Sequence, residues 1–162
     1  MIVVSNVHKT YGDRIVVNNV SLTLTRGGVT SIIGPNGAGK STLLSMIARL
    51  LPMSAGSVMV DGMDVTNTPS HELARRLSIL RQDNHIAARL SVYDLVSFGR
   101  FPYSKGKLTA DDLRHIDEAI AHLDLQEHAN RFLDELSGGS VSAPLWPWCC
   151  AKVQTMCYLT SP

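Results

Sequence analysis

The stretch "GPNGAGKS", Gly34 to Ser41, decides the fold because it matches the phosphate-binding pattern G-x-x-x-x-G-K-[ST]. A short and nearly continuous apolar run, Val29 to Ile33, precedes it and is typical of a buried strand in a parallel sheet. Apolar residues at helical spacing follow it from Thr42 to Leu51, where Pro52 ends the pattern. This order of strand, glycine-rich turn and helix predicts a loop that holds a nucleotide triphosphate.

The chemistry of this loop assigns roles to its residues. Glycines allow successive backbone N–H groups to turn inward around a phosphate, and the helix that follows adds the positive end of its dipole. We expect Lys40 to reach the β- and γ-phosphates and the Ser41 hydroxyl to coordinate Mg²⁺. The alternative is an ordinary glycine-rich turn with a solvated lysine, and the strand and helix on either side argue against it. The predicted nucleotide-binding residues are Gly34, Pro35, Asn36, Gly37, Ala38, Gly39, Lys40, Ser41 and Thr42.

Composition narrows the classes of protein to consider. The 162 residues suit one domain, and the net charge of +1 comes from scattered basic residues, which does not indicate a nucleic-acid partner. No apolar run approaches the roughly 20 residues of a membrane span, and the start lacks a signal-peptide pattern, so we expect a cytoplasmic chain. Cys149, Cys150 and Cys157 form an odd set with adjacent members, and we interpret them as free thiols.

Periodicity predicts the remaining elements. Ile2 to Val7 and Asn19 to Leu24 alternate as antiparallel strands, Ser57 to Val60 is a further strand, and "LSIL" from Leu77 is another. A short helix is expected from Thr68-Pro69 to about Leu77. Capping boxes at Ser91–Asp94 and Thr109–Asp112 each begin a helix, and the second carries an apolar stripe. The members of that stripe are Leu113, Ile116, Ile120 and Leu123. The chain therefore divides into an α/β part up to about Gln82, a helical part over about 84–135, and a tail.

A second motif, "LSGG" at Leu136 to Gly139, lies about a hundred residues after the phosphate loop. Together the two motifs resemble the nucleotide-binding domain of ABC transporters, over roughly residues 1–139. The resemblance implies an α/β fold of the P-loop NTPase class, with an antiparallel β layer, a parallel core sheet and a helical subdomain at about 84–135, incomplete at its C-terminus. Residues 140–162 do not match this pattern.

The resemblance also implies further site residues. Tyr11 of "KTYGD" matches the aromatic residue that stacks on adenine, and Gln82 matches the glutamine that touches Mg²⁺ and the attacking water. Ser137, Gly138 and Gly139 match the signature that grips the γ-phosphate of an ATP held by a second subunit. Simpler interpretations remain, in which Tyr11 is a turn residue and Gln82 a polar residue at a strand end. Lys40 and Gln82 are thus the expected catalytic residues, with Ser41 and Gln82 at the metal.

The expected ligands and partners follow from the family. They are ATP with Mg²⁺, a second ATPase subunit in a head-to-tail dimer, and integral-membrane permease subunits at the cytoplasmic face of the cell membrane; nucleic acid is not expected. The segment "LVSFGRFPYSKGKLT", Leu95 to Thr109, resembles the ATPases that energise iron-siderophore uptake, although haem and cobalamin importers remain possible by the same likeness. An alternative interpretation of Phe98, Phe101 and Tyr103 is a protein–protein face, of which permease docking is one instance.

The tail departs from the family pattern directly after Gly139. Ser140 stands where the pattern has glutamine, and residues 140–162 contain no acidic residue to serve as the Walker B pair. Our hypothesis is the loss of one base from a CAG codon after Gly139, because suitable synonymous codons in the other frame read "RQRAFMAMVLCQGTDYVLLDEP". The alternative is a divergent tail in which Leu145, Trp146 and Trp148 form a small apolar patch. The prolines Pro144 and Pro147 argue against regular structure there.

Three functions are compatible with these features. The leading hypothesis is an ATP-binding subunit of an ABC importer, most consistent with ferric-siderophore uptake. Without the Walker B acids and the switch histidine, we expect no hydrolysis by the chain as given. The alternatives are a non-hydrolysing binding or regulatory module and an inactive fragment.

Overall fold

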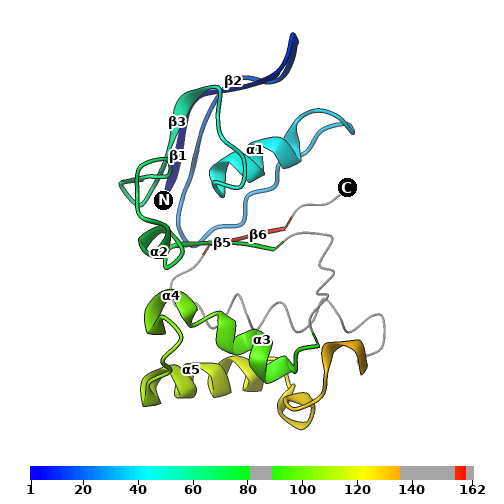
Figure 1. Cartoon of the computed structure of the whole chain (residues 1–162). Helices are drawn as coiled ribbons and strands as arrows, with labels where there is room; N and C mark the ends of the chain where they lie inside the picture. The colour runs from blue at the N-terminus through cyan, green and yellow to red at the C-terminus, as the bar shows by residue number, and fades with distance from the viewer. Residues whose placement is uncertain (81–88, 136–155, 160–162) are drawn as a thin grey trace.

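The computed structural model describes residues 1–80, 89–135 and 156–159, the last four and residues 79–80 as backbone only. Figure 1 shows an antiparallel β layer with one helix against it, a two-stranded parallel pair below, and a group of helices at the other end of the molecule. The fold class expected from the sequence is confirmed in outline. Among the described residues, no helix has both the length and the apolar character needed to cross a membrane.

The antiparallel layer has the strand order β2-β1-β3-β4. Its strands are β1 (Ile2–Tyr11), β2 (Arg14–Leu24), β3 (Ala55–Val60) and β4 (Met63–Asp64). The first two strands are longer than the periodicity predicts and meet in the turn after Tyr11. Their alternating apolar residues form one core with the inner face of α1 (Lys40–Ile47). The buried members of this core include Ile2, Val4, Val7, Val17, Leu43, Met46 and Ile47.

The predicted strand at Val29 to Ile33 is wrong. The chain from Thr25 to Gly39 has no regular strand, and the side chains of Val29 and Ile33 are 99% and 91% exposed. A strand is stabilised by hydrogen bonds to a neighbour and by a buried face. No strand of the described part of the chain pairs with these residues, and their apolar character alone cannot supply either contribution.

Parallel pairing occurs elsewhere. The strand β5 (Leu77–Leu80), predicted from the sequence, pairs in parallel with β6 (Met156–Leu159), with Leu77 opposite Met156 and Leu80 opposite Leu159. Figure 1 shows this pair between the antiparallel layer and the helices. Residues 156–159 of the tail therefore contribute a strand that the sequence analysis did not predict. The proposed apolar patch of Leu145, Trp146 and Trp148 lies outside the described residues.

The helical part begins with the two predicted caps. Ser91 and Thr109 each accept a hydrogen bond from the amide three residues on, and the carboxylates of Asp94 and Asp112 each accept one from the cap amide. These boxes open α3 (Val92–Phe98) and α5 (Ala110–Ala121). The short helices α2 (Ser70–Leu73) and α4 (Phe101–Ser104) and two 3₁₀ turns, η1 (Gln126–His128) and η2 (Leu133–Glu135), complete the described elements.

The predicted apolar stripe of α5 is only partly correct. Ile116 and Ile120 are buried against α3, whereas Leu113 and Leu123 remain partly exposed. Asp112, which is not a member of the predicted stripe, is buried. The reason is an ion pair with Arg100, in which Arg100 Nε lies 2.8 Å from Asp112 Oδ1.

Candidate nucleotide-binding site

The phosphate loop has the backbone conformation that its glycines permit. Gly37 and Gly39 adopt φ values of +83° and +85°, in the left-handed region that a Cβ disfavours. Between them, the amide of Ala38 donates to the carbonyl of Pro35 at 3.2 Å, which closes a tight turn. Gly39 is the N-cap of α1, so the loop runs directly into a helix N-terminus. A helix N-terminus that follows directly on a glycine-rich turn is a place where an anion is favoured.

Gly39 is also required by its contact with β2. A Cβ at this position would lie 2.5 Å from the carbonyl oxygen of Val16 and 3.2 Å from Cγ2 of Val17. In the β1–β2 register, Lys9 faces Val17 and Thr10 faces Ile15, so Val16 is an extra residue in β2. Such a bulge turns a carbonyl out of the ladder. The last glycine of the loop thus packs directly on the bulge of the hairpin that carries Tyr11.

Lys40 lies over the loop rather than in solvent. Its ammonium donates to the carbonyl oxygens of Gly34 at 2.8 Å and Pro35 at 3.0 Å. The first turn of α1 contains no acidic residue, so nothing there offsets the positive end of the helix dipole. A phosphate group in the loop would meet the N–H groups, the dipole and this ammonium together.

The other predicted residues of the loop gather at the same place. Ser41 is exposed in the first turn of α1, and Thr42 is partly exposed beside it. An exposed hydroxyl at this point suits Mg²⁺, which prefers oxygen ligands and keeps several waters. Among the described residues, no atom lies within 4 Å of a Cβ added at Gly37, so the space directly beside this glycine is open.

Tyr11 is the last residue of β1, and its side chain is 52% exposed. It pairs with Arg14 across the turn, on the same hairpin whose other strand touches Gly39. The fold therefore brings the predicted adenine-stacking residue and the predicted phosphate loop to one end of the antiparallel layer. Gln82, Ser137, Gly138 and Gly139 lie outside the described residues, and their roles stay predictions.

One residue of this site was missed by sequence analysis. Lys9, two residues before Tyr11 on β1, is only 9% exposed, and its ammonium lies 5.1 Å from the centre of the Tyr11 ring. Strand periodicity could have found it, because residues two apart point to the same face of a strand. The signal in the sequence is a lysine two residues before the proposed stacking residue on the same strand.

The predicted protein–protein face on the helical part is partly wrong. Phe98 and Phe101 are about half exposed, in agreement with the expectation. Tyr103 instead contacts two guanidinium groups, whose Cζ atoms lie 5.3 Å (Arg75) and 4.2 Å (Arg100) from the centre of its ring. Its hydroxyl donates to the Arg75 carbonyl at 3.1 Å. These contacts join the α2 end of the α/β part to the helices.

The Asp112 carboxyl is the acid at the centre of the helical part. Burial by itself raises its pKa most strongly, but hydrogen bonds from the Thr109 amide and hydroxyl, and then from Arg100, outweigh this. The pKa of Asp112 therefore lies below its usual range, and the carboxyl is charged at neutral pH.

Comparison with known proteins agrees with this geometry. The family model described as ABC transporter matches residues 17–143. The chain is 49% identical over 139 residues to the petrobactin import ATP-binding protein YclP of Bacillus subtilis, which covers 86% of this chain and 55% of the relative. It is 52% identical over 139 residues to the petrobactin import ATP-binding protein FatE of Bacillus anthracis, with 86% and 56% covered. The chain thus spans about half the length of these curated relatives.

Solved structures share the fold. CbiO1 from Clostridium perfringens, part of the ABC transporter complex cbiONQ, superposes with a TM-score of 0.77 at 25% identity, covering 96% of this chain and 64% of that one. The ATP-binding subunit of another ABC transporter gives a TM-score of 0.76 at 20% identity, with 93% and 60% covered. With a glycine loop, a lysine and a helix N-terminus shaped for phosphate, and with the family match over residues 17–143, this chain belongs to the ABC transporter family.

Proposed function

We propose that this chain binds magnesium-ATP as the nucleotide-binding subunit of an ABC importer for ferric siderophores. The observation that carries the proposal is the loop itself: Gly37 and Gly39 in left-handed conformations, with the Lys40 ammonium held over the turn at the start of α1. The Tyr11 hairpin packs on the same loop through Val16. A base and a triphosphate can therefore be bound at one end of the β layer.

The cargo class is proposed from the relatives. Two of them, about half identical to this chain, are named as petrobactin import ATP-binding proteins. A hemin import ATP-binding protein of Pseudomonas entomophila is 36% identical over 155 residues, so haem is the competing cargo. We propose the siderophore because the identity is higher. In this role the subunit acts at the cytoplasmic face of the membrane, with permease subunits and a second ATPase subunit placed head to tail.

The chain as given is proposed to bind ATP without hydrolysing it. Family catalysis uses a Walker B aspartate and glutamate after the "LSGG" signature, and residues 140–162 contain neither amino acid. If these residues are out-of-frame text after Gly139, the frame-restored protein regains the acids and with them hydrolysis. Sequencing the gene around the Gly139 codon tests this point. An intact reading frame, with no "DEP" encoded in either of the other frames, would contradict the frameshift.

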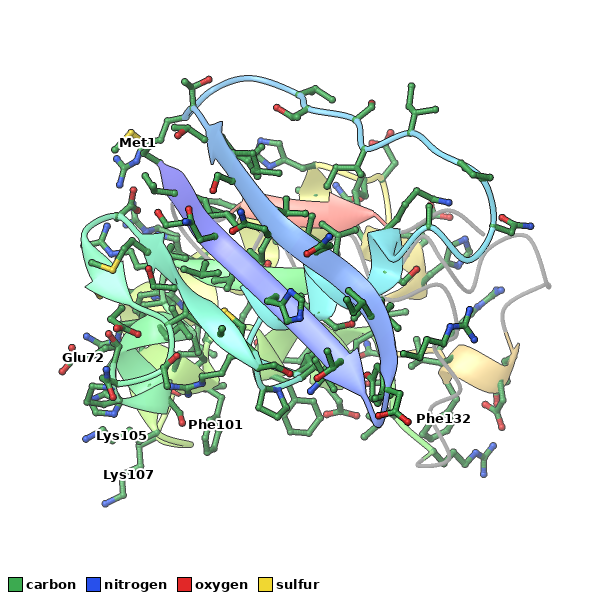
Figure 2. All side chains as sticks on the ribbon, turned by 90° about the horizontal axis from the view of Figure 1, so that it is seen from above. Met1, Glu72, Phe101, Lys105, Lys107 and Phe132 are labelled. Atoms are coloured by element: carbon green, nitrogen blue, oxygen red, sulfur yellow. The ribbon has the colours of Figure 1, made fainter. Side chains whose placement is uncertain are left out.

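Nucleotide binding is tested by titration calorimetry of the chain with magnesium-ATP. Lys40→Met is expected to weaken binding about tenfold or more, because a charge-assisted contact to phosphate contributes about 1.5–3 kcal/mol. Lys107→Met is the matched control. Figure 2 shows Lys107 projecting from the edge of the molecule, far from α1. No heat from the unsubstituted chain, or equal affinity of the two variants, would contradict the proposal.

The cargo is tested in cells with the frame-restored gene. Disruption of the gene is expected to abolish growth on a ferric siderophore as sole iron source and to leave growth on haem intact. The opposite pattern would transfer the proposal to haem.

The second candidate function, a non-hydrolysing regulatory module, is favoured by the absence of acids from residues 140–162. It predicts that the chain as given co-purifies with the permease or with an intact ATPase subunit.

A further inference from the structure

Lys9 is a nearly buried lysine at the nucleotide end of the molecule. Only 9% of it is exposed, and burying an ammonium is costly unless polar groups replace its water. Two groups do so: the carbonyl oxygen of Pro52 accepts a hydrogen bond at 2.7 Å, and the Tyr11 ring lies with its centre 5.1 Å from the ammonium. The second contact is of the cation–π type, in which the charge approaches the face of the ring.

The acceptor of Lys9 lies in the loop that follows the phosphate-loop helix. This loop is joined to β1 on both sides of Lys9. The Ser54 amide donates to the His8 carbonyl at 2.9 Å, and the Thr10 amide donates to the Ser54 hydroxyl at 3.2 Å. Residues 8–10 of β1 and residues 52–54 after α1 therefore form one hydrogen-bonded junction, and Tyr11 is the next residue along the strand.

The same junction touches the phosphate loop from the other side. Lys9 is opposite Val17 in the β1–β2 register, and Val17 packs against Gly39. Lys9 thus contacts Tyr11 and the loop at Pro52 that follows α1. Through Val17 it is also linked to Gly39, at the start of α1. Its ammonium lies over the Tyr11 ring, while about half of Tyr11 stays open to solvent.

We propose that Lys9 is a positioning residue for nucleobase binding. Its ammonium, fixed by Pro52, holds the Tyr11 ring in one orientation, so that the open face can stack on a purine while the loop binds the triphosphate. The proposal rests on the proposed nucleotide binding and adds to it a residue that acts through Tyr11. It separates base recognition, which needs Lys9, from phosphate recognition, which does not.

The test compares two ligands, magnesium-ATP and magnesium tripolyphosphate, which has the phosphates without the base. Lys9→Met keeps the length and apolar stem of the side chain and removes the charge. We expect about three- to tenfold weaker ATP binding, the range of a cation–π contact converted to affinity, and unchanged tripolyphosphate binding. Lys9→Arg keeps the charge and should keep the ratio of the two affinities. Lys107→Met serves as the control for loss of a surface lysine.

A double-mutant cycle with Tyr11→Leu identifies the route of the effect. In the Tyr11→Leu background, Lys9→Met should have no further effect on ATP binding, because the residue through which Lys9 acts is gone. If Lys9→Met does not fold, as judged by circular dichroism, Lys9→Gln carries the same expectation, since it retains a donor for Pro52 without the charge.

The outcomes separate this inference from the proposed function. Equal weakening of both ligands shows a purely structural role for Lys9 and overturns the inference, as does an unchanged ATP affinity or an additive cycle. In these cases ATP binding by the unsubstituted chain still stands. If the unsubstituted chain binds neither ligand, the proposed function fails first and the inference with it.

Discussion

The contact between Gly39 and the bulge at Val16 yields the sharpest prediction, for the substitution Gly39→Ala. The added methyl group would lie 2.5 Å from the Val16 carbonyl oxygen and 3.2 Å from Cγ2 of Val17. A non-glycine residue at φ +85° costs about 1–2 kcal/mol, and forced overpacking typically adds about 1–3 kcal/mol. The free energy of unfolding should fall by about 2–5 kcal/mol.

Gly62→Ala is the matched control. Gly62 has nearly the same backbone conformation, with φ +82°, but no atom of the described part of the chain lies within 4 Å of its added Cβ. It should lose only the conformational part, about 1–2 kcal/mol. Urea unfolding without nucleotide measures both variants, so the comparison does not depend on ligand binding. Titration with magnesium-ATP then adds a second readout, because Gly39→Ala displaces the phosphate loop and Gly62→Ala does not.

Equal losses of unfolding free energy in the two variants would refute this reasoning. The contact with Val16 would then contribute nothing, and Gly39 would be needed only for its backbone conformation. Reduced stability of Gly39→Ala with full ATP affinity would refute the link from the hairpin to the loop instead.

Two further predictions concern charged pairs. Hydrogen bonds from Arg26, first, and from the Met1 amino group lower the pKa of Asp61 from 3.8 to about 2. The stabilisation from this carboxylate is therefore complete above about pH 4 and is lost toward about pH 2. Asp61→Asn should lower the free energy of unfolding by about 1 kcal/mol or less at neutral pH. Chemical-denaturation curves should show the difference between this variant and the unsubstituted chain narrowing as the pH falls. Arg100→Met should lower it by about 3–5 kcal/mol, because it leaves the buried Asp112 carboxylate without its cation. Arg114→Met, at an exposed pair, should change it little, and similar melting temperatures for both arginine variants would contradict this account.

Local chemistry in the sequence predicted those parts of the structure that depend on neighbouring residues. The capping boxes at Ser91 and Thr109 were correct because their hydrogen bonds close within three residues. The left-handed glycines of the phosphate loop and the helix after them follow from the same local rules. The family motif predicted Tyr11 as a stacking residue, and the hairpin places it at the same end of the β layer as the loop.

Residues whose environment is made by distant segments escaped prediction. Asp112 was predicted only as the acid of a capping box, and its burial became evident from Arg100, twelve residues earlier, which lies against it. Tyr103 was predicted as part of an exposed face, yet the guanidinium groups of Arg75 and Arg100 lie over its ring. Periodicity reports which side of an element is apolar, but not which charged group from another element will lie against it.

The sequence by itself determined the phosphate loop, the hairpin, the helix caps and the family, because each of these depends on short-range geometry or on a motif. Only the tertiary structure decided that Val29 to Ile33 forms no strand and that Lys9 is buried beside Tyr11. A strand needs a partner for its hydrogen bonds, and a buried ammonium needs acceptors in place of water. Both depend on where distant segments of the chain come to lie.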